Sequence, residues 1–141
     1  MKIKIKKLDP QAKMPTNGTK GAAGFDLYAT HDVTLRRGVP TMVGTGLAFE
    51  IPEGFVGVVY SRSSTAKKGI VITPLLVDFD YRGEVFILAN YLGAGAESYE
   101  VKAGDRIAQM RIESLVPTEY EWAEELSETE RGAGGYGSTG R

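Results

Sequence analysis

The chain has 141 residues, of which 42% are hydrophobic, and this is enough for one domain with a substantial buried core. Its 17 basic and 18 acidic side chains leave a formal net charge of -1, so no overall electrostatic attraction draws it to nucleic acid or to an anionic membrane. The absence of cysteine excludes disulfides and thiolate metal sites.

The N-terminus alternates lysine with isoleucine over residues 2–6. A period of two predicts a half-exposed strand, and the lysines are better explained as its solvated face than as a nucleic-acid-binding arm. The sequence contains no apolar run of membrane-spanning length, and the first residues lack the continuous apolar core of a signal peptide. We therefore expect a soluble cytoplasmic protein, or one of the host-cell cytoplasm if its source is viral, with no nucleic-acid or membrane partner.

Short strand patterns dominate the rest of the chain. A loop rich in glycine and proline is predicted for residues 9–24, and a turn region for residues 99–105. The predicted strands cover residues 25–29, 34–35, 41–51, 55–60, 84–91 and 106–115. Short strands separated by Gly and Pro turns predict an all-β fold, a distorted jelly-roll barrel or sandwich.

Only two segments favour helix. Residues 63–69 begin with hydroxyl side chains suited to an N-cap and end at a glycine, which predicts a turn or two. Residues 119–130 are rich in helix formers, although Tyr120, Trp122 and Leu126 do not give a clean helical period. The expected fold therefore contains at most one or two short helical segments.

The C-terminus differs in composition from the predicted jelly-roll domain of residues 1–130. Residues 131–141 contain five glycines and cannot bury enough apolar surface to order themselves. A flexible terminus is one interpretation. The other is a lid, in which backbone amides, Ser138 and Thr139 hold phosphates while Tyr136 stacks on a flat ring. The lone aromatic favours the lid.

Residues 75–88 are the stretch around which the chain is organised. An apolar run is interrupted by Asp78, Asp80, Tyr81 and Arg82, and then strand formers resume. The polar cluster is therefore expected where one strand turns into the next. Polar side chains at such a position are accessible to a ligand and are held by the rigid strands on either side.

Two further loops contain groups that bind anions. Arg62, Ser63 and Ser64 lie where a strand leads into a helical turn, and exposed amides at such a turn attract anions, although a simple helix cap also explains the serines. Residues 104–109 are equally compatible with a strand entry that carries an ion pair. Together with the tail and the two aspartates, these groups suggest a triphosphate and a means of cutting it.

Five motifs now stand in order, and together they resemble those of the homotrimeric dUTPases (deoxyuridine 5'-triphosphate nucleotidohydrolases). The motifs occupy residues 23–29, 62–66, 77–83, 104–109 and 131–140. The second and fourth also occur in the related dCTP deaminases. The fifth, with its arginine and aromatic, is specific to the dUTPases.

The resemblance implies hydrolysis of dUTP to dUMP and pyrophosphate, which keeps uracil out of DNA and supplies dUMP for dTMP synthesis. Water attacks the α-phosphate, and Mg²⁺ is held mainly by the phosphates and by water. Asp78 matches the carboxylate that orients and deprotonates this water. Asp80 and Arg82 would fix the loop geometry, and Tyr81 would pack under the deoxyribose and exclude a 2′-hydroxyl.

The resemblance also assigns binding roles. Asp26 matches the aspartate that reaches the metal through water. The matches to phosphate-binding groups are Arg62, Ser63, Ser64 and Gln109 at the α and β phosphates and Arg131, Gly137, Ser138 and Thr139 in the fifth motif, which closes on the γ-phosphate. Tyr136 would lie over the uracil, where phenylalanine is usual, and it keeps the stacking face.

In these relatives three chains share each site. One subunit supplies the first, second and fourth motifs, a neighbour the third, and the remaining subunit the fifth. The resemblance therefore implies a homotrimer and an inactive monomer.

One departure concerns base selection. Ile72 and Leu75 replace an asparagine and a glycine that many relatives have in the hairpin that reads uracil, whereas Pro74 is retained. A side chain in place of glycine is expected to alter the turn or narrow the pocket. Selectivity for uracil is therefore less firmly predicted than phosphate hydrolysis.

Three alternatives to a dUTPase stand beside this interpretation. A dCTP deaminase is disfavoured, because Leu88 lies where its catalytic glutamate would be. The hypothesis that the protein is a nucleotide-binding regulator, which keeps the pocket and signals to a protein partner, remains an alternative. A structural jelly roll, such as a coat protein, would leave the clustered Arg, Ser and Asp motifs unexplained.

Overall fold

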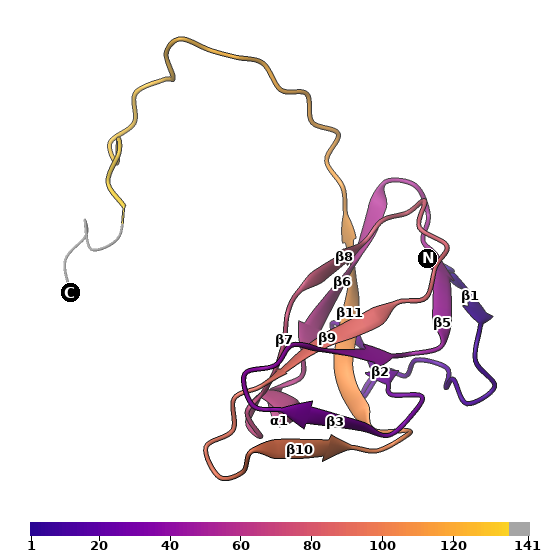
Figure 1. Ribbon diagram of the computed structural model, residues 1–141. Helices are drawn as coiled ribbons and strands as arrows, with labels where there is room; N and C mark the ends of the chain where they lie inside the picture. The colour runs from indigo at the N-terminus through magenta and orange to yellow at the C-terminus, as the bar shows by residue number, and fades with distance from the viewer. Residues whose placement is uncertain (136–141) are drawn as a thin grey trace.

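The computed structural model of the chain describes residues 1–135, and these residues are almost all β-structure and loops (Figure 1). The helix and strands are β1 Lys4–Lys7, β2 Phe25–Tyr28, β3 Val33–Arg36, β4 Thr41–Gly44, β5 Leu47–Glu50, β6 Phe55–Ser61, α1 Ser63–Ala66, β7 Ile70–Ile72, β8 Leu75–Val77, β9 Phe86–Tyr91, β10 Ser98–Val101 and β11 Arg106–Ser114. The predicted all-β jelly-roll class is confirmed, with one short helix among the described residues.

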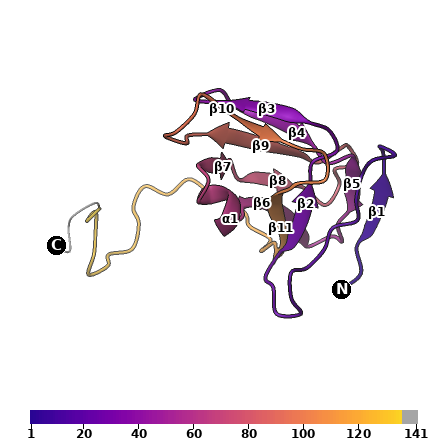
Figure 2. The ribbon, with the colours of Figure 1, turned by 90° about the horizontal axis from the view of Figure 1, so that it is seen from below.

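The strands form two layers. The larger sheet has the order β2-β11-β6-β8, and the facing layer contains β4-β9-β7 and the pair β10-β3 (Figure 2). A separate pair, β1-β5, stands at one side. All of these neighbours are antiparallel, and among the described residues no two strands consecutive in sequence pair with each other, so each connection runs from one sheet to another.

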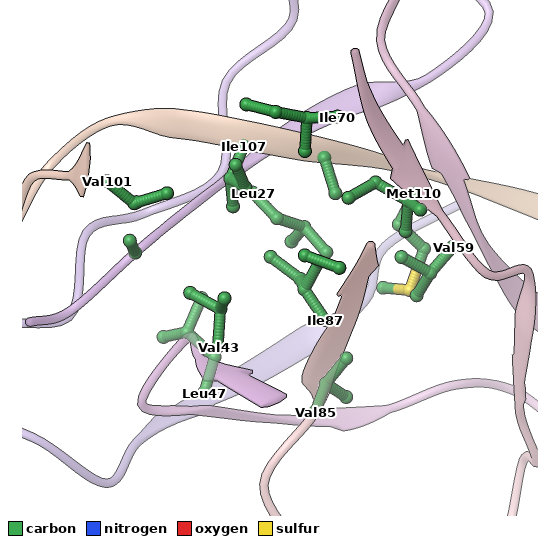
Figure 3. Close-up of a cluster of buried hydrophobic side chains, with 14 of the residues drawn as sticks. Leu27, Val43, Leu47, Val59, Ile70, Val85, Ile87, Val101, Ile107 and Met110 are labelled. Carbon is green, nitrogen blue, oxygen red and sulfur yellow. The ribbon is translucent and has the colours of Figure 1, made fainter. Parts of the chain in front are cut away.

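The core lies between the two layers (Figure 3). Alternation explains how the strands fill it: along β9 the side chains are buried at every second residue, with Ile87 and Ala89 fully inside. Leu27, Val59 and Met110 enter from the opposite sheet and are equally buried. The core therefore fixes the register of both sheets and gives the loops at their ends a rigid base.

Two strand predictions need correction. The expected turn region of residues 99–105 begins as strand β10, because Tyr99 pairs with Leu35 and Val101 is fully buried. The expected strand of residues 41–51 divides into β4 and β5 at Gly46, which has φ +65°. A Cβ at Gly46 would lie 2.6 Å from the Cβ of Asp9, so the close approach of the loop requires glycine.

The two helix predictions had opposite outcomes. The expected helical turn is present as α1, and Gly69, with φ +80°, ends the turns that follow it. The predicted helix over residues 119–130 is wrong, because these residues form neither helix nor strand. Trp122 and its apolar neighbours are exposed, so an isolated segment of this length has no packing surface to stabilise a helix.

Candidate active site

A buried carboxylate organises the end of the larger sheet. Asp26, on β2, accepts a hydrogen bond of 2.7 Å from Arg62 Nε and another of 3.3 Å from Arg106 Nη1. Its side chain is 11% exposed, and that of Arg62 is 19% exposed. Two guanidinium groups therefore compensate one desolvated carboxylate, as a buried charge requires.

Asp26→Ala is expected to lower the free energy of unfolding by about 3 kcal/mol, because it leaves the half-buried Arg62 without its counter-charge. Urea denaturation of the two proteins measures the difference. The matched control is Asp32→Ala, which removes an exposed ion pair with Lys102 and should cost much less. Equal losses for the two variants would contradict a structural role for the Asp26 cluster.

Arg62 also shapes the loop that carries the two serines. Its Nη1 donates 3.0 Å hydrogen bonds to Ser64 Oγ and to the Arg106 carbonyl oxygen. Thr65 Oγ1 donates to the Arg62 carbonyl oxygen over 2.9 Å. Ser63 and Ser64 are exposed at the start of α1. Arg62 thus donates its hydrogen bonds within the protein, and the loop that it holds exposes the hydroxyls of Ser63 and Ser64 to solvent.

Gln109 lies beside this cluster because of strand register. On β11 it stands opposite Asp26 of β2 on one side and Tyr60 of β6 on the other. Its Nε2 donates to the Ser61 carbonyl oxygen over 2.9 Å. A hollow is lined by Ala23, Gly24, Tyr60, Ser61, Gln109 and Arg111. A Cβ on Gly24 would lie 3.2 Å from Gln109 Oε1, so glycine keeps this hollow open.

A second hollow lies on the other side of Arg62, between α1 and the β10–β11 turn. It is polar, and its lining includes Arg62, Ser64, Lys68, Tyr99, Asp105 and Arg106. Lys68 Nζ donates a 3.2 Å hydrogen bond to Tyr99 Oη. Arg62 and Arg106 already pair with Asp26, so three cations stand against the two carboxylates of Asp26 and Asp105, which leaves a small excess of positive charge. Lys68 and Arg106 were missed as site residues; Arg106 stood inside a recognised motif, whereas no sequence signal singled out Lys68.

The aspartate loop between β8 and β9 is a separate structure. Arg82 Nη1 donates to the carbonyl oxygens of Phe79, over 2.6 Å, and Tyr81, over 3.0 Å. Tyr81 Oη donates to the Glu84 carbonyl oxygen over 3.0 Å. The loop therefore holds its own shape, and it presents the exposed carboxylates of Asp78 and Asp80 to solvent.

The two groups of predicted residues do not meet within one chain. Val77, just before Asp78, pairs with Gly57 near the start of β6, whereas Arg62 follows the other end of that strand. Arg62 is five residue steps along the extended chain from Gly57, and the rise of a strand makes this a distance of about 17 Å. Asp26, Arg62, Ser64 and Gln109 are brought together, while Asp78, Tyr81 and Arg82 lie far from them along the sheet.

Known proteins are similar to this chain in both sequence and fold. The family model for dUTPase matches residues 10–140. The chain belongs to the dUTPase family. It is 48% identical to the deoxyuridine 5'-triphosphate nucleotidohydrolase of Nautilia profundicola, with all of both chains covered. The solved structure of the Staphylococcus bacteriophage 80alpha dUTPase with dUpNHpp is 29% identical, has a TM-score of 0.93, and the match covers 99% of each chain. The predicted family is therefore confirmed.

The segment that was expected to form a base-reading hairpin instead supplies strands to two different sheets, because β7 pairs with β9 and β8 pairs with β6. Among the described residues only glycines have a positive φ, so Leu75 adopts an ordinary strand conformation. Ile72 is buried, and its N–H donates a 2.8 Å hydrogen bond to Ser61 Oγ. Asn90 Nδ2 donates to Thr73 Oγ1 over 2.9 Å. Leu75 therefore needs no positive φ here, and side chains of neighbouring strands hold the segment between β7 and β8.

The fifth dUTPase motif is only partly described. Arg131 is exposed in the long C-terminal segment that leaves the body of the molecule after β11 (Figure 1). Its carbonyl oxygen accepts a hydrogen bond of 3.0 Å from Gly134 N. The predictions for Tyr136, Gly137, Ser138 and Thr139 lie outside the described residues.

The few carboxylates near the site limit how a metal ion can bind there. Residues 1–135 contain no group of three or more His, Asp or Glu side chains placed to hold an ion. Asp26 is the one carboxylate in its cluster, and it already accepts from two arginines. These residues fit an ion that arrives with its own oxygen ligands, as Mg²⁺ bound to phosphates and water does. A variant of the dUTPase of phage phi11 of S. aureus, 25% identical over 89% of this chain and 99% of that chain, with a TM-score of 0.82, is described with a structural Mg(II) ion.

One phenol of the site has a shifted pKa. The 3.0 Å hydrogen bond to Glu113 raises the pKa of Tyr60, and partial burial adds to the effect. The Tyr60 hydroxyl therefore stays protonated where it lines the Gln109 hollow.

No helix in residues 1–135 is long and apolar enough to span a membrane.

Proposed function

We propose that this protein hydrolyses dUTP to dUMP and pyrophosphate, keeping uracil out of DNA and supplying dUMP for dTMP synthesis in the cytoplasm. The family assignment and the fold shared with a phage dUTPase that binds dUpNHpp support this reaction. The observation that carries the mechanism is the division of the predicted site into two surfaces. One offers hydroxyls, an amide and cations, and the other offers an exposed carboxylate.

Asp78 is the general base in this proposal. Its carboxylate accepts a proton from water as the water oxygen attacks the α-phosphorus; the bond from that phosphorus to the bridging oxygen breaks, and pyrophosphate leaves. Arg82 and Asp80 keep the loop in place, consistent with the hydrogen bonds from Arg82 to loop carbonyls. Tyr81, 44% exposed, offers a ring face to the sugar.

The phosphates bind the other surface. Ser63, Ser64 and Gln109 donate to the α and β phosphates, and Arg62 acts mainly by positioning Ser64, because its own donors are used within the protein. Mg²⁺, when bound, neutralises phosphate charge, and Asp26 would contact it through water. Positioned donors of this kind stabilise charge that develops on the leaving group.

A homotrimer would bring the two surfaces together. Asp78 of one copy meets the phosphate surface of a neighbour, since about 17 Å of strand separates them within a chain. The outer face of β4-β9-β7 offers a surface for assembly, because Met42 is 56% and Val71 is 41% exposed there beside the half-buried Phe86 and Leu88. Apolar faces of this kind mark protein interfaces.

The arm of residues 131–141 closes over bound nucleotide in this proposal. Arg131, Gly137, Ser138 and Thr139 contact the γ-phosphate, and Tyr136 covers the base. Deleting residues 131–141 is expected to lower kcat/KM at least about 10²-fold while leaving the melting temperature unchanged. A truncated protein with full activity would show that the arm is only a flexible terminus.

Release of pyrophosphate by the purified protein with Mg²⁺ tests the proposed reaction. We expect rapid release from dUTP and little from dCTP, dTTP or UTP measured in parallel. Release from dCTP or dTTP would retain the phosphate chemistry but refute base selection by the segment that contains Ile72 and Leu75, whereas release from UTP would refute exclusion of the 2′-hydroxyl by Tyr81. Binding of dUTP without release from any nucleotide would contradict the reaction and favour a nucleotide-binding regulator.

A further inference from the structure

The loop of Asp78 and Tyr81 ends in a segment that is bonded to the turn between β4 and β5. Thr45 Oγ1 donates a 2.6 Å hydrogen bond to the Val85 carbonyl oxygen, and Val85 N donates to the Leu47 carbonyl oxygen over 2.9 Å. Thr45 is 1% exposed and Val85 is 2% exposed. Buried hydrogen bonds are costly to break, so this end of the loop is held in one place.

Glu84 adds a side-chain link to the same turn. Its Oε1 accepts a 2.8 Å hydrogen bond from Gly46 N. A Cβ on Gly44 would lie 2.9 Å from this oxygen, so glycine leaves room for the carboxylate. Among residues 1–135 no basic side chain forms an ion pair with Glu84. The half-buried carboxylate therefore acts here as an acceptor for a backbone N–H, not as one member of a charge pair.

The backbone of Glu84 receives the phenol of Tyr81. Tyr81 Oη donates to the Glu84 carbonyl oxygen over 3.0 Å. The ring lies close against Gly83, where a Cβ would be 2.6 Å from Tyr81 Cζ. Glycine thus allows the ring to fold back over its own loop, and the hydrogen bond fixes its hydroxyl end. The remainder of the ring, 44% exposed as a residue, is accessible to a ligand.

We propose that Glu84 is a positioning residue for sugar selection and that it acts through Tyr81. Its side chain holds the end of the loop against Gly46, its carbonyl oxygen holds the Tyr81 ring, and the ring in that place leaves no room for a 2′-hydroxyl. The proposal rests on the proposed function, in which Tyr81 packs under the deoxyribose. It adds what keeps the ring there, because steric exclusion works only when the excluding group is held rigidly.

Asp78, at the other end of the loop, is held by different contacts. The preceding Val77 is 5% exposed and pairs with Gly57 of β6. The Asp78 carbonyl oxygen accepts a 3.1 Å hydrogen bond from Tyr81 N. Loss of the Glu84 side chain should therefore loosen the Tyr81 ring more than the Asp78 carboxylate. Sugar selection and turnover of dUTP are expected to respond differently.

The variants Glu84→Ala and Glu84→Gln test the proposal through kcat/KM for dUTP and for UTP. Glu84→Ala is expected to lower the dUTP-to-UTP ratio at least about 10-fold, with a much smaller change in kcat for dUTP. Glu84→Gln keeps an oxygen that accepts from Gly46 N and should keep the ratio. So should the control Glu53→Ala, which removes an exposed glutamate from another turn. Equal losses for both nucleotides in Glu84→Ala, or equal ratios in Glu84→Ala and Glu84→Gln, would overturn the proposal.

Tyr81→Phe tests the second link without altering the Glu84 side chain. Phenylalanine keeps the ring but cannot donate to the Glu84 carbonyl oxygen. The dUTP-to-UTP ratio should fall in the same direction as in Glu84→Ala. A ratio equal to that of the unmodified protein would overturn the proposal, because the ring would then be held without this hydrogen bond.

Hydrogen exchange and affinity make the test independent of turnover. In the full chain, the Gly46 N–H should exchange faster in Glu84→Ala but not in Glu84→Gln, while the Val85 N–H stays protected in both and shows that the fold is intact. Calorimetry with dUpNHpp and its ribose counterpart UpNHpp should show a smaller preference for the deoxyribose in Glu84→Ala. Unchanged Gly46 exchange or an unchanged preference would contradict the role of Glu84. An unmodified protein that failed to hydrolyse dUTP would contradict the proposed function and leave both of these readouts interpretable.

Discussion

An Asp78→Asn variant is expected to bind dUTP nearly as tightly as the unmodified protein but to turn it over about 10²–10⁴-fold more slowly. Asparagine keeps the size and the hydrogen-bonding edge of aspartate but cannot accept the proton of the attacking water. The exposed loop keeps its shape, because the hydrogen bonds from Arg82 and Tyr81 to loop carbonyls do not involve Asp78 side-chain atoms. Pyrophosphate release gives kcat, and calorimetry with the non-hydrolysable dUpNHpp gives affinity.

Asp80→Asn is the matched control, since Asp80 is exposed in the same loop two residues away. Its loss of kcat should be much smaller, because it is proposed to support loop geometry only. Turnover retained by Asp78→Asn would remove Asp78 as the base. A loss confined to Asp80→Asn would move that role to the other carboxylate.

Strands were predictable from sequence where alternation spans many residues. The pattern of residues 106–115 predicted β11, which lies between β2 and β6 and buries Ile107, Ala108 and Met110, although a register shift near Ala108 interrupts the strict alternation. β10 was missed because its four residues carry little signal, and its pairing with β3 is what defines it. The helix predicted at residues 119–130 failed for the opposite reason. Helix propensity was present, but the chain supplies no surface for that helix to pack on.

The candidate site was predictable as a set of residues but not as an arrangement. Motifs indicated Asp26, Arg62, Gln109 and Asp78 individually. The ion pair that ties Arg62 to Asp26 depends on β2 and β6 both flanking β11, which no local pattern encodes. The separation of Asp78 from the others likewise follows from the register of β8 on β6. Long-range pairing therefore decides which candidates can act together.

That separation leads to a second strong expectation, that two inactive variants restore activity when they share a trimer. Asp78→Asn damages only the carboxylate surface, and Gln109→Ala damages only the phosphate surface, where Gln109 lies between Asp26 and Tyr60. If each site takes its phosphate surface from one copy and Asp78 from its neighbour, random mixed trimers contain intact sites. At equal amounts these amount to about one quarter of all sites. Joint refolding followed by pyrophosphate release from dUTP measures the recovery.

The control mixes Gln109→Ala with Ser63→Ala/Ser64→Ala, two variants damaged on the same surface. No recovery is expected from that mixture, because every phosphate surface in it carries one lesion or the other, whichever copy provides Asp78. Both mixtures undergo the same refolding, so a difference between them cannot come from handling. If the first mixture also stays inactive, each chain must build its site alone. The loop of Asp78 would then have to move about 17 Å along β6, which the paired and buried Val77 opposes.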